Sequence, residues 1–165
     1  MTTTTARHKL PLLMPGQAQK EMFHNESLAA IDALLHAAVE GVGMTAPPAA
    51  PGIGQSWIVG ATPTGDWAGQ AHALASWTDG GWRFQTPVPG LGVTVAATGT
   101  EARWDGEAWR VGDVRAERVL IGGVQVVGAR RGAIPAPAGG ATVDAEARAA
   151  VAAILFALRT HGLVA

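Results

Sequence analysis

The sequence predicts an α+β protein with an N-terminal helical segment, a small Trp-rich antiparallel β domain of hairpins, and a C-terminal amphipathic helix. Apolar residues recur at helical spacing near both ends of the 165-residue chain, and the middle repeats a Trp, Asp-Gly, Trp pattern. The 22 glycines and 10 prolines favour short elements joined by turns. We expect three parts: an arm and helical docking segment at 1–44, a Pro/Gly linker and β domain at 45–131, and a linker and oligomerisation helix at 132–165.

The N-terminal segment is predicted to hold an arm and two short helices. Residues 2–7 are polar and without period, which is typical of a flexible arm. Pro15 and Gly16 favour the start of a first helix at residues 17–23. The apolar period lapses at residues 24–27, where Asn25 suits the cap of a second helix.

The second helix is predicted to carry an apolar stripe that needs a surface to bury it. The stripe consists of Leu28, Ile31, Leu35 and Ala38, flanked by Leu34 and Val39. We interpret Leu28, Ile31 and Leu35 as the interface residues of this stripe.

The β-like middle begins after a proline-rich linker at 45–52, which is predicted to be neither helix nor central strand. Residues 56–59 read as a short strand, and residues 93–97 as another. Two similar units, ASWTDGGWRF at 75–84 and ARWDGEAWRV at 102–111, each read as a hairpin closed by an Asp-Gly turn.

The C-terminal part is predicted to contain a β tract, a second linker and a helix. The tract at 118–127 should turn or bulge at Gly122-Gly123, and residues 132–141 are rich in Pro, Gly and Ala. A helix is expected at 143–161, capped by Thr142 or Asp144, with Gly162 just beyond its end. Its residues Val151, Ile154 and Leu158, together with Ala147, form a heptad-like seam widened by Leu155.

Two explanations for the apolar faces of the terminal helices stay open. The helices can pack on each other or on the sheet within one copy. Alternatively, at least the C-terminal helix packs against its symmetry mates, with Val151, Ile154 and Leu158 in the oligomer interface.

Composition argues against several classes of partner. The formal net charge is −1 and no block of like charge occurs, so nucleic-acid binding is not expected. There is no cysteine, no apolar run of membrane-spanning length and no signal-peptide pattern. We therefore expect no disulfide, no membrane partner and assembly in the cytoplasm.

No pattern of catalytic or metal-binding residues stands out. The five histidines lack metal-ligand spacing; His36 and Asp32 are four residues apart, a spacing that more often marks a solvated polar pair. No serine lies in a nucleophile motif of the form G-x-S-x-G, and the sequence contains no phosphate-binding loop motif. We predict no enzyme activity, no metal and no cofactor.

The six tryptophans, against no tyrosine, are the one outlier of composition. Most are expected in a core or an interface, although exposed indoles also stack on sugar rings. The candidate glycan contacts are Trp82, Arg83, Trp109 and Arg110.

Several motifs resemble an uncharacterised domain family found in bacteriophage tail and fibre proteins and in gene transfer agents of alphaproteobacteria. They are LPLL at 10–13, PGQAQKE at 15–21, HNE at 24–26, WIVG at 57–60, residues 77–84, and GGVQVVGAR at 122–130. The resemblance attaches no chemistry to any residue, but it implies a component of a virion or phage-like particle.

Sequence and resemblance together predict a structural protein that forms a spike or fibre base. The resemblance covers most of the chain, which favours a base over a receptor-binding tip. The expected partners are copies of the chain in a trimer or pentamer, capsid or tail proteins, and a following spike or fibre protein. The alternative is a module that binds host capsular polysaccharide through the Trp-rich sheet, and a capsule-degrading enzyme ranks last.

Overall fold

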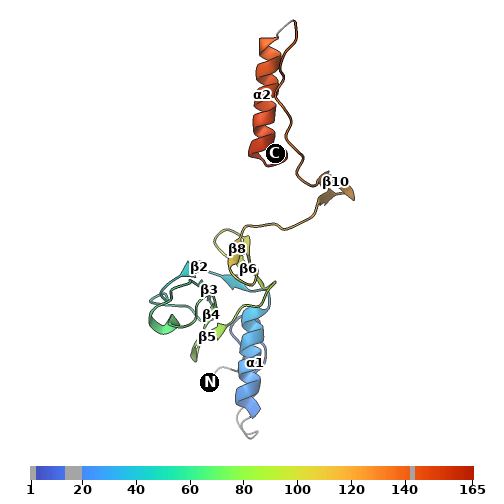
Figure 1. Ribbon diagram of the computed structural model, residues 1–165. Coiled ribbons are helices and arrows are strands. Elements are labelled where there is room, and N and C mark those ends of the chain that lie inside the picture. The colour runs from blue at the N-terminus through green and yellow to red at the C-terminus, as the bar shows by residue number, and fades with distance from the viewer. Residues whose placement is uncertain (1–2, 14–19, 142–143) are drawn as a thin grey trace. The chain divides into compact units, whose positions relative to one another are not determined.

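A computed structural model describes residues 3–13, 20–141 and 144–165 of the chain (Figure 1). The chain divides into two units, Met1–Asp113 and Val114–Ala165. The first unit holds the N-terminal helix and two sheets, and the second holds a hairpin and the C-terminal helix. The predicted boundaries are at residues 44 and 131, whereas the two units divide after Asp113. Residues 38–44, which end at the first predicted boundary, contribute strands to both sheets of the first unit.

Helix α1, Lys20–Leu34, is continuous, so the predicted break at residues 24–27 is wrong. Asn25 does not cap a second helix. Its side chain accepts a hydrogen bond from the backbone N–H of Leu13 and donates one to the carbonyl of Leu13. The polar residues in this turn therefore serve tertiary contacts instead of ending the helix. The predicted helix start at Gly16 and the positions 17–19 lie outside the described residues.

The segment that follows α1 is extended, which corrects the prediction that the helical stripe continues to Ala38 and Val39. It forms β1, Ala38–Val39, and β2, Gly41–Met44. Strand β1 pairs in parallel with β6, Gly92–Val95, and β2 pairs in parallel with β3, Ser56–Val59. One short stretch of chain thus belongs to both sheets.

The first unit contains two four-stranded sheets, in the orders β1-β6-β7-β8 and β2-β3-β4-β5. The predicted hairpins are confirmed as β4, Leu74–Thr78, with β5, Gly81–Gln85, and as β7, Thr100–Trp104, with β8, Trp109–Val111. Trp77 is paired with Trp82 and Trp104 with Trp109, each pair next to its Asp-Gly turn. The short helix η1, Gly65–Trp67, lies between β3 and β4 in the sequence. The fold class is therefore α+β, as predicted.

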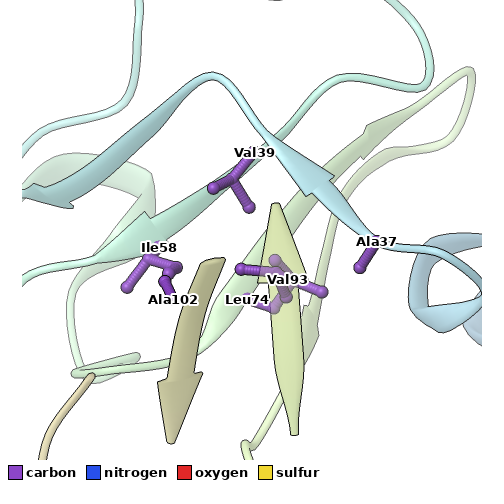
Figure 2. Packing of buried hydrophobic residues seen from close by; sticks show 6 residues of the cluster. All are labelled: Ala37, Val39, Ile58, Leu74, Val93 and Ala102. Carbon is purple, nitrogen blue, oxygen red and sulfur yellow. The ribbon is translucent and has the colours of Figure 1, made fainter. Parts of the chain in front are cut away.

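Two apolar clusters form the core of the first unit. One lies between the sheets and consists of Ala37, Val39, Ile58, Leu74, Val93 and Ala102 (Figure 2). The other gathers Trp57, Val59 and Ala75 on the opposite face of the β2–β5 sheet, under Trp67 of η1. Alternation along β3 explains this arrangement, since Ile58 faces one cluster while its neighbours Trp57 and Val59 face the other.

The second unit begins with a hairpin of β9, Val119–Ile121, and β10, Val124–Val127. The predicted turn is confirmed at Gly122 and Gly123, which have φ angles of 58° and 81°, and the register shifts between Gln125 and Val127. Both glycines adopt a left-handed conformation that a β-branched residue would strain.

The C-terminal helix α2 spans Ala145–Thr160, close to its prediction. Asp144 is its N-cap, accepting a hydrogen bond from the backbone N–H of Ala147 at 2.8 Å. Gly162, with a φ of 70°, follows the cap residue His161. The alternative cap Thr142 and the first predicted helical residue, Val143, lie outside the described residues.

An extended segment runs beside α2 in the second unit (Figure 1). Arg131 pairs in parallel with Val164 near the end of the chain. The guanidinium of Arg159 donates to the carbonyl of Ile134 at 2.6 Å, and that of Arg148 donates to the carbonyl of Gly139. The predicted linker at 132–141 therefore packs on the helix through side-chain to backbone bonds.

Candidate functional site

The N-terminal arm is docked on helix α1, so the prediction of a flexible arm is wrong for residues 3–7. Thr4 bridges Pro11 in a small antiparallel loop, and the carboxylate of Asp32 holds this loop. Asp32 accepts hydrogen bonds from the hydroxyl of Thr5 at 2.7 Å and from the backbone N–H groups of Arg7 at 2.8 Å and His8 at 2.5 Å. We call this set of contacts the arm anchor.

Arg7 also caps the C-terminal end of α1. Its guanidinium donates to the carbonyls of Asp32, Ala33, Leu35 and His36, at distances of 2.6–3.2 Å. The last carbonyls of a helix have no partner within the helix and carry partial negative charge, so a cation that bonds them stabilises the end. The arm therefore completes the helix on which it rests.

The anchor also shifts the acidity of Asp32, whose side chain is buried with 5% exposure. Burial raises the pKa, but the hydrogen bonds from Thr5, Arg7 and His8 outweigh it, and the net pKa lies below the usual value for aspartate. Asp32 is thus held ionised by the arm, and not by His36, its predicted polar partner.

A small cavity of about 150 Å³ lies between the arm, α1 and the β2–β5 sheet. Its walls include Thr5, Leu12, Asp32, Ser56, Ser76 and Arg83. The buried hydroxyls of Ser56 and Ser76, on paired strands, bond each other at 2.8 Å. This polar half of the sheet face lies under α1, while Ile58 and Leu74 cover the other half of the same face.

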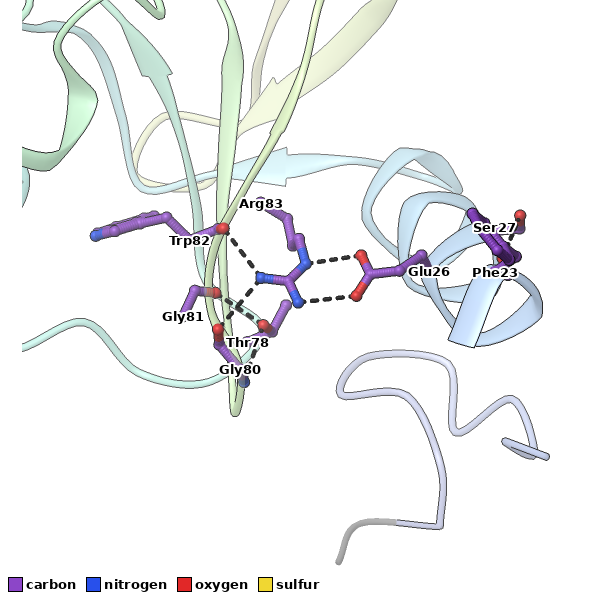
Figure 3. A network of polar contacts seen from close by, with 8 residues as sticks. All are labelled: Phe23, Glu26, Ser27, Thr78, Gly80, Gly81, Trp82 and Arg83. Atoms are coloured by element: carbon purple, nitrogen blue, oxygen red, sulfur yellow. Dashed lines mark hydrogen bonds and ion pairs between the residues drawn. The ribbon is translucent and has the colours of Figure 1, made fainter. Parts of the chain in front are cut away.

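An ion pair joins α1 to the sheet. Arg83 bonds Glu26 with both ends of its guanidinium, Nε to Oε2 at 2.7 Å and Nη2 to Oε1 at 2.8 Å. Figure 3 shows Arg83 reaching from β5 toward α1 while Trp82 points to the opposite side of the strand. The hydrogen bond from Arg83 lowers the pKa of Glu26, although both side chains keep considerable exposure.

The Trp-rich face of the β2–β5 sheet is a packed aromatic cluster. Trp82 contacts three other indoles edge to face, with ring centroids 4.9 Å from Trp77, 5.2 Å from Trp67 and 5.5 Å from Trp57. Trp57 and Trp67 are buried, whereas Trp77 and Trp82 are partly exposed. The Nε1 of Trp67 is buried without a hydrogen-bond partner.

The remaining predicted glycan contacts lie in the other sheet. Trp109 packs beside Trp104 at 5.7 Å between ring centroids, and its Nε1 donates to the carbonyl of His72 at 2.9 Å. Arg110 pairs with Asp105 at 2.6 Å within the hairpin turn. Trp82 and Arg83 therefore lie in one sheet and Trp109 and Arg110 in the other. Both arginines form ion pairs, Arg83 with Glu26 and Arg110 with Asp105.

The predicted docking residues of α1 are only partly covered. Ile31 is 50% exposed and Leu35 44% exposed, while Leu28 is partly buried. The sequence stripe missed Met22 and Phe23, which are 60% and 74% exposed. Both residues were assigned to the end of a separate first helix, so they were not counted in the apolar stripe that begins at Leu28.

The predicted oligomer residues of α2 show a similar exposure. Val151 is 40% and Ile154 59% exposed, whereas Leu158 is partly buried. Leu155, which the sequence placed at the edge of the seam, is the buried residue of the helix. Phe156 is 71% exposed and stands on another side of α2, because two residues separate it from Ile154 by about 200° around the helix.

The described residues contain no group of three or more histidine, aspartate or glutamate side chains that could hold a metal ion. In the same part of the chain, no helix has the length and apolar character needed to cross a membrane.

A family model described as "Protein of unknown function (DUF2793)" matches residues 24–110. The chain belongs to this family. No curated protein matches the sequence significantly. The DUF2793 match begins within α1 and ends in β8, so it takes in both sheets and both apolar clusters of the first unit. The arm and the whole second unit lie outside it.

Proposed function

We propose that this DUF2793 protein is a structural component of a phage-like particle of the gene-transfer-agent type, where copies of the chain form the base of a spike or fibre. The first unit attaches to a capsid or tail protein through the exposed residues of α1, and α2 joins the copies as a trimer or pentamer. The base supports adhesion to the host surface. The virion context comes from the resemblance of the motifs at 10–26, 57–60, 77–84 and 122–130 to phage and gene-transfer-agent proteins.

The observation that carries this proposal is that few apolar side chains of the second unit are buried. Among its described residues, only Leu155 and Val164 are buried hydrophobic side chains. A unit of this size needs a larger core or a partner to be stable. The seam of α2, with Val151 and Ile154 exposed, supplies the surface for that partner.

Mass measurement of the full chain tests the association. We expect a defined oligomer at micromolar concentration by sedimentation equilibrium. Ile154→Glu should shift the chain toward monomer, because a charge in the seam loses its hydration on association. Ala149→Glu is the matched control, since Ala149 is exposed on the opposite side of α2. A strictly monomeric wild-type chain would count against the proposal.

Attachment to the particle is tested separately through α1. Particles purified from a producing strain that lacks this gene should bind the purified chain on co-sedimentation. Ile31→Glu should reduce binding while leaving the oligomer intact, because Ile31 is half exposed and outside both apolar clusters. Unchanged binding would remove α1 from the docking surface.

Glycan binding is the alternative function, and the partly exposed indoles Trp82 and Trp109 favour it. Binding on a capsular glycan array that disappears with Trp82→Ala or Trp109→Ala, while oligomer mass is unchanged, would support this alternative. Because the two indoles lie in different sheets, we expect one of the substitutions to dominate.

A further inference from the structure

We propose that the β9–β10 hairpin is a second self-association surface, which packs against the same hairpin face of another copy. This inference rests on the proposed homo-oligomer and adds to the contact through α2. The face consists of Val119, Ile121, Val124 and Val127, and we call it the hairpin face.

The register of the hairpin places these four side chains together. Ile121 is paired with Val124, and Val119 is paired with Val127. Paired residues share a face of an antiparallel sheet, and so do Val119 and Ile121, which are two residues apart. The bulge at the end of β10 matters here. Without it, Val126 would pair with Val119, whereas the shift gives that place to Val127.

The hairpin face is uncovered in a single copy. Its side chains are 44%, 67%, 67% and 42% exposed, in the order Val119, Ile121, Val124 and Val127. The other face, with Leu120 paired to Gln125, is exposed as well. A two-stranded hairpin alone is marginally stable in water, so this one needs a further layer.

The composition of the face favours an identical face as that layer. All four members are β-branched and uncharged, so two copies can meet without bringing like charges together. Charged residues flank the hairpin in the sequence, at Glu117, Arg118 and Arg130. An apolar centre with polar residues around it is typical of protein interfaces.

The small area of the hairpin face indicates that the second copy of the chain also covers α2. Stable interfaces bury about 800 Å² on each partner, which is much more than four aliphatic side chains supply. The exposed seam of α2 lies in the same unit and needs the same kind of cover. In a homo-oligomer, neighbouring copies of this unit can cover both the hairpin face and the α2 seam. We therefore expect both surfaces to be buried in the same oligomer.

The test compares two double variants of the full chain by sedimentation equilibrium across a concentration series. Ile121→Thr with Val124→Thr places hydroxyl groups on the hairpin face while keeping β-branched residues. Leu120→Thr with Gln125→Thr, on the other face of the same strands, is the matched control. We expect the first to raise the concentration for half-association at least tenfold and the control to change it less than threefold. Far-ultraviolet circular dichroism checks that both stay folded.

The outcomes separate this inference from the proposed function. If wild type is monomeric throughout, both fail. If Ile154→Glu dissociates the oligomer while the two double variants behave alike, association through α2 holds and the hairpin face is refuted.

Discussion

Removing the carboxylate of Asp32 should release the N-terminal arm from α1. In Asp32→Ala, the hydroxyl of Thr5 and the backbone N–H groups of Arg7 and His8 lose their shared acceptor. Water must then satisfy these donors, and it reaches all of them when the arm leaves the helix. The detached arm also takes the guanidinium of Arg7 away from the last carbonyls of α1.

The size of the effect follows from the hydrogen bonds that are lost. A net contribution of about 1.5–3 kcal/mol is typical of one hydrogen bond to a charged group. The three bonds do not add in full, because they break together when the arm detaches. We therefore expect the free energy that holds the arm on α1 to fall by at least about 2 kcal/mol. This loss corresponds to an increase of about 30-fold in the population of chains with a detached arm.

Limited proteolysis measures this population directly. Trypsin cleaves after arginine and lysine, and the arm contains Arg7 and Lys9. When opening is fast relative to cleavage, the cleavage rate follows the population of the open form. Mass spectrometry of the N-terminal peptides should show cleavage about 30-fold faster in Asp32→Ala. Asp113→Ala, which removes an exposed carboxylate of the same unit, is the control. Equal rates in the two variants would refute the arm anchor.

The arm anchor should also depend on pH in a predictable direction. The folded-state pKa of Asp32 is lowered, so its contribution to stability is complete above the ordinary carboxyl pKa of about 4. The contribution is lost as the pH falls from there through the lowered pKa. Hydrogen exchange of the Arg7 and His8 amides, corrected for intrinsic rates, should lose protection over this range in wild type and show no such step in Asp32→Ala.

Three further predictions concern the stability of the first unit, measured by denaturant unfolding. Trp67→Ala should cost about 3–5 kcal/mol because Trp67 is fully buried, and Trp67→Phe should cost less, since Nε1 has no partner to lose; equal losses would contradict this view of the cluster. Arg83→Lys should cost less than about 1 kcal/mol, as the ion pair with α1 is partly exposed to solvent. Gly60→Ala should cost about 1–3 kcal/mol because its Cβ would lie 2.6 Å from the backbone oxygen of Gly43 in β2, and an unchanged stability would contradict this close approach.

The hairpins and α2 could be predicted from sequence because their signals are local. An Asp-Gly pair fixes the turn between strands that follow each other, and an N-cap aspartate and a terminal glycine mark α2. Asp105 illustrates how complete this local information is. Its carboxylate accepts from the backbone N–H groups of Ala108 and Glu107 and pairs with Arg110, and these contacts, in that order, lower its pKa strongly.

The elements that sequence reasoning missed depend on distant partners. Residues 24–27 stay helical because Asn25 and Glu26 bond Leu13 and Arg83, and the second of these is 57 residues away. Ala38 and Val39 are extended because β6 pairs with them in parallel, a contact that no local period encodes. The arm anchor likewise depends on distant partners, because Thr5 and His8 are 27 and 24 positions from Asp32 in the sequence. Its only sequence signal was an aspartate on a helix face beside apolar neighbours.

The packing of the tryptophans accounts for most of the unusual composition and narrows the glycan alternative. Trp57, Trp67 and Trp104 are 5%, 0% and 8% exposed, so half of the indoles serve as core where large aliphatic residues are few. Of the partly exposed indoles, Trp109 already uses its N–H on His72, while Trp77 and Trp82 lie together. A sugar ring stacked on Trp82 would have its polar partners on that same face. Arg83 lies on the opposite side, bonded to α1, so any glycan site is better sought around Trp77 and Trp82 than around the Trp82–Arg83 neighbours that the sequence singled out.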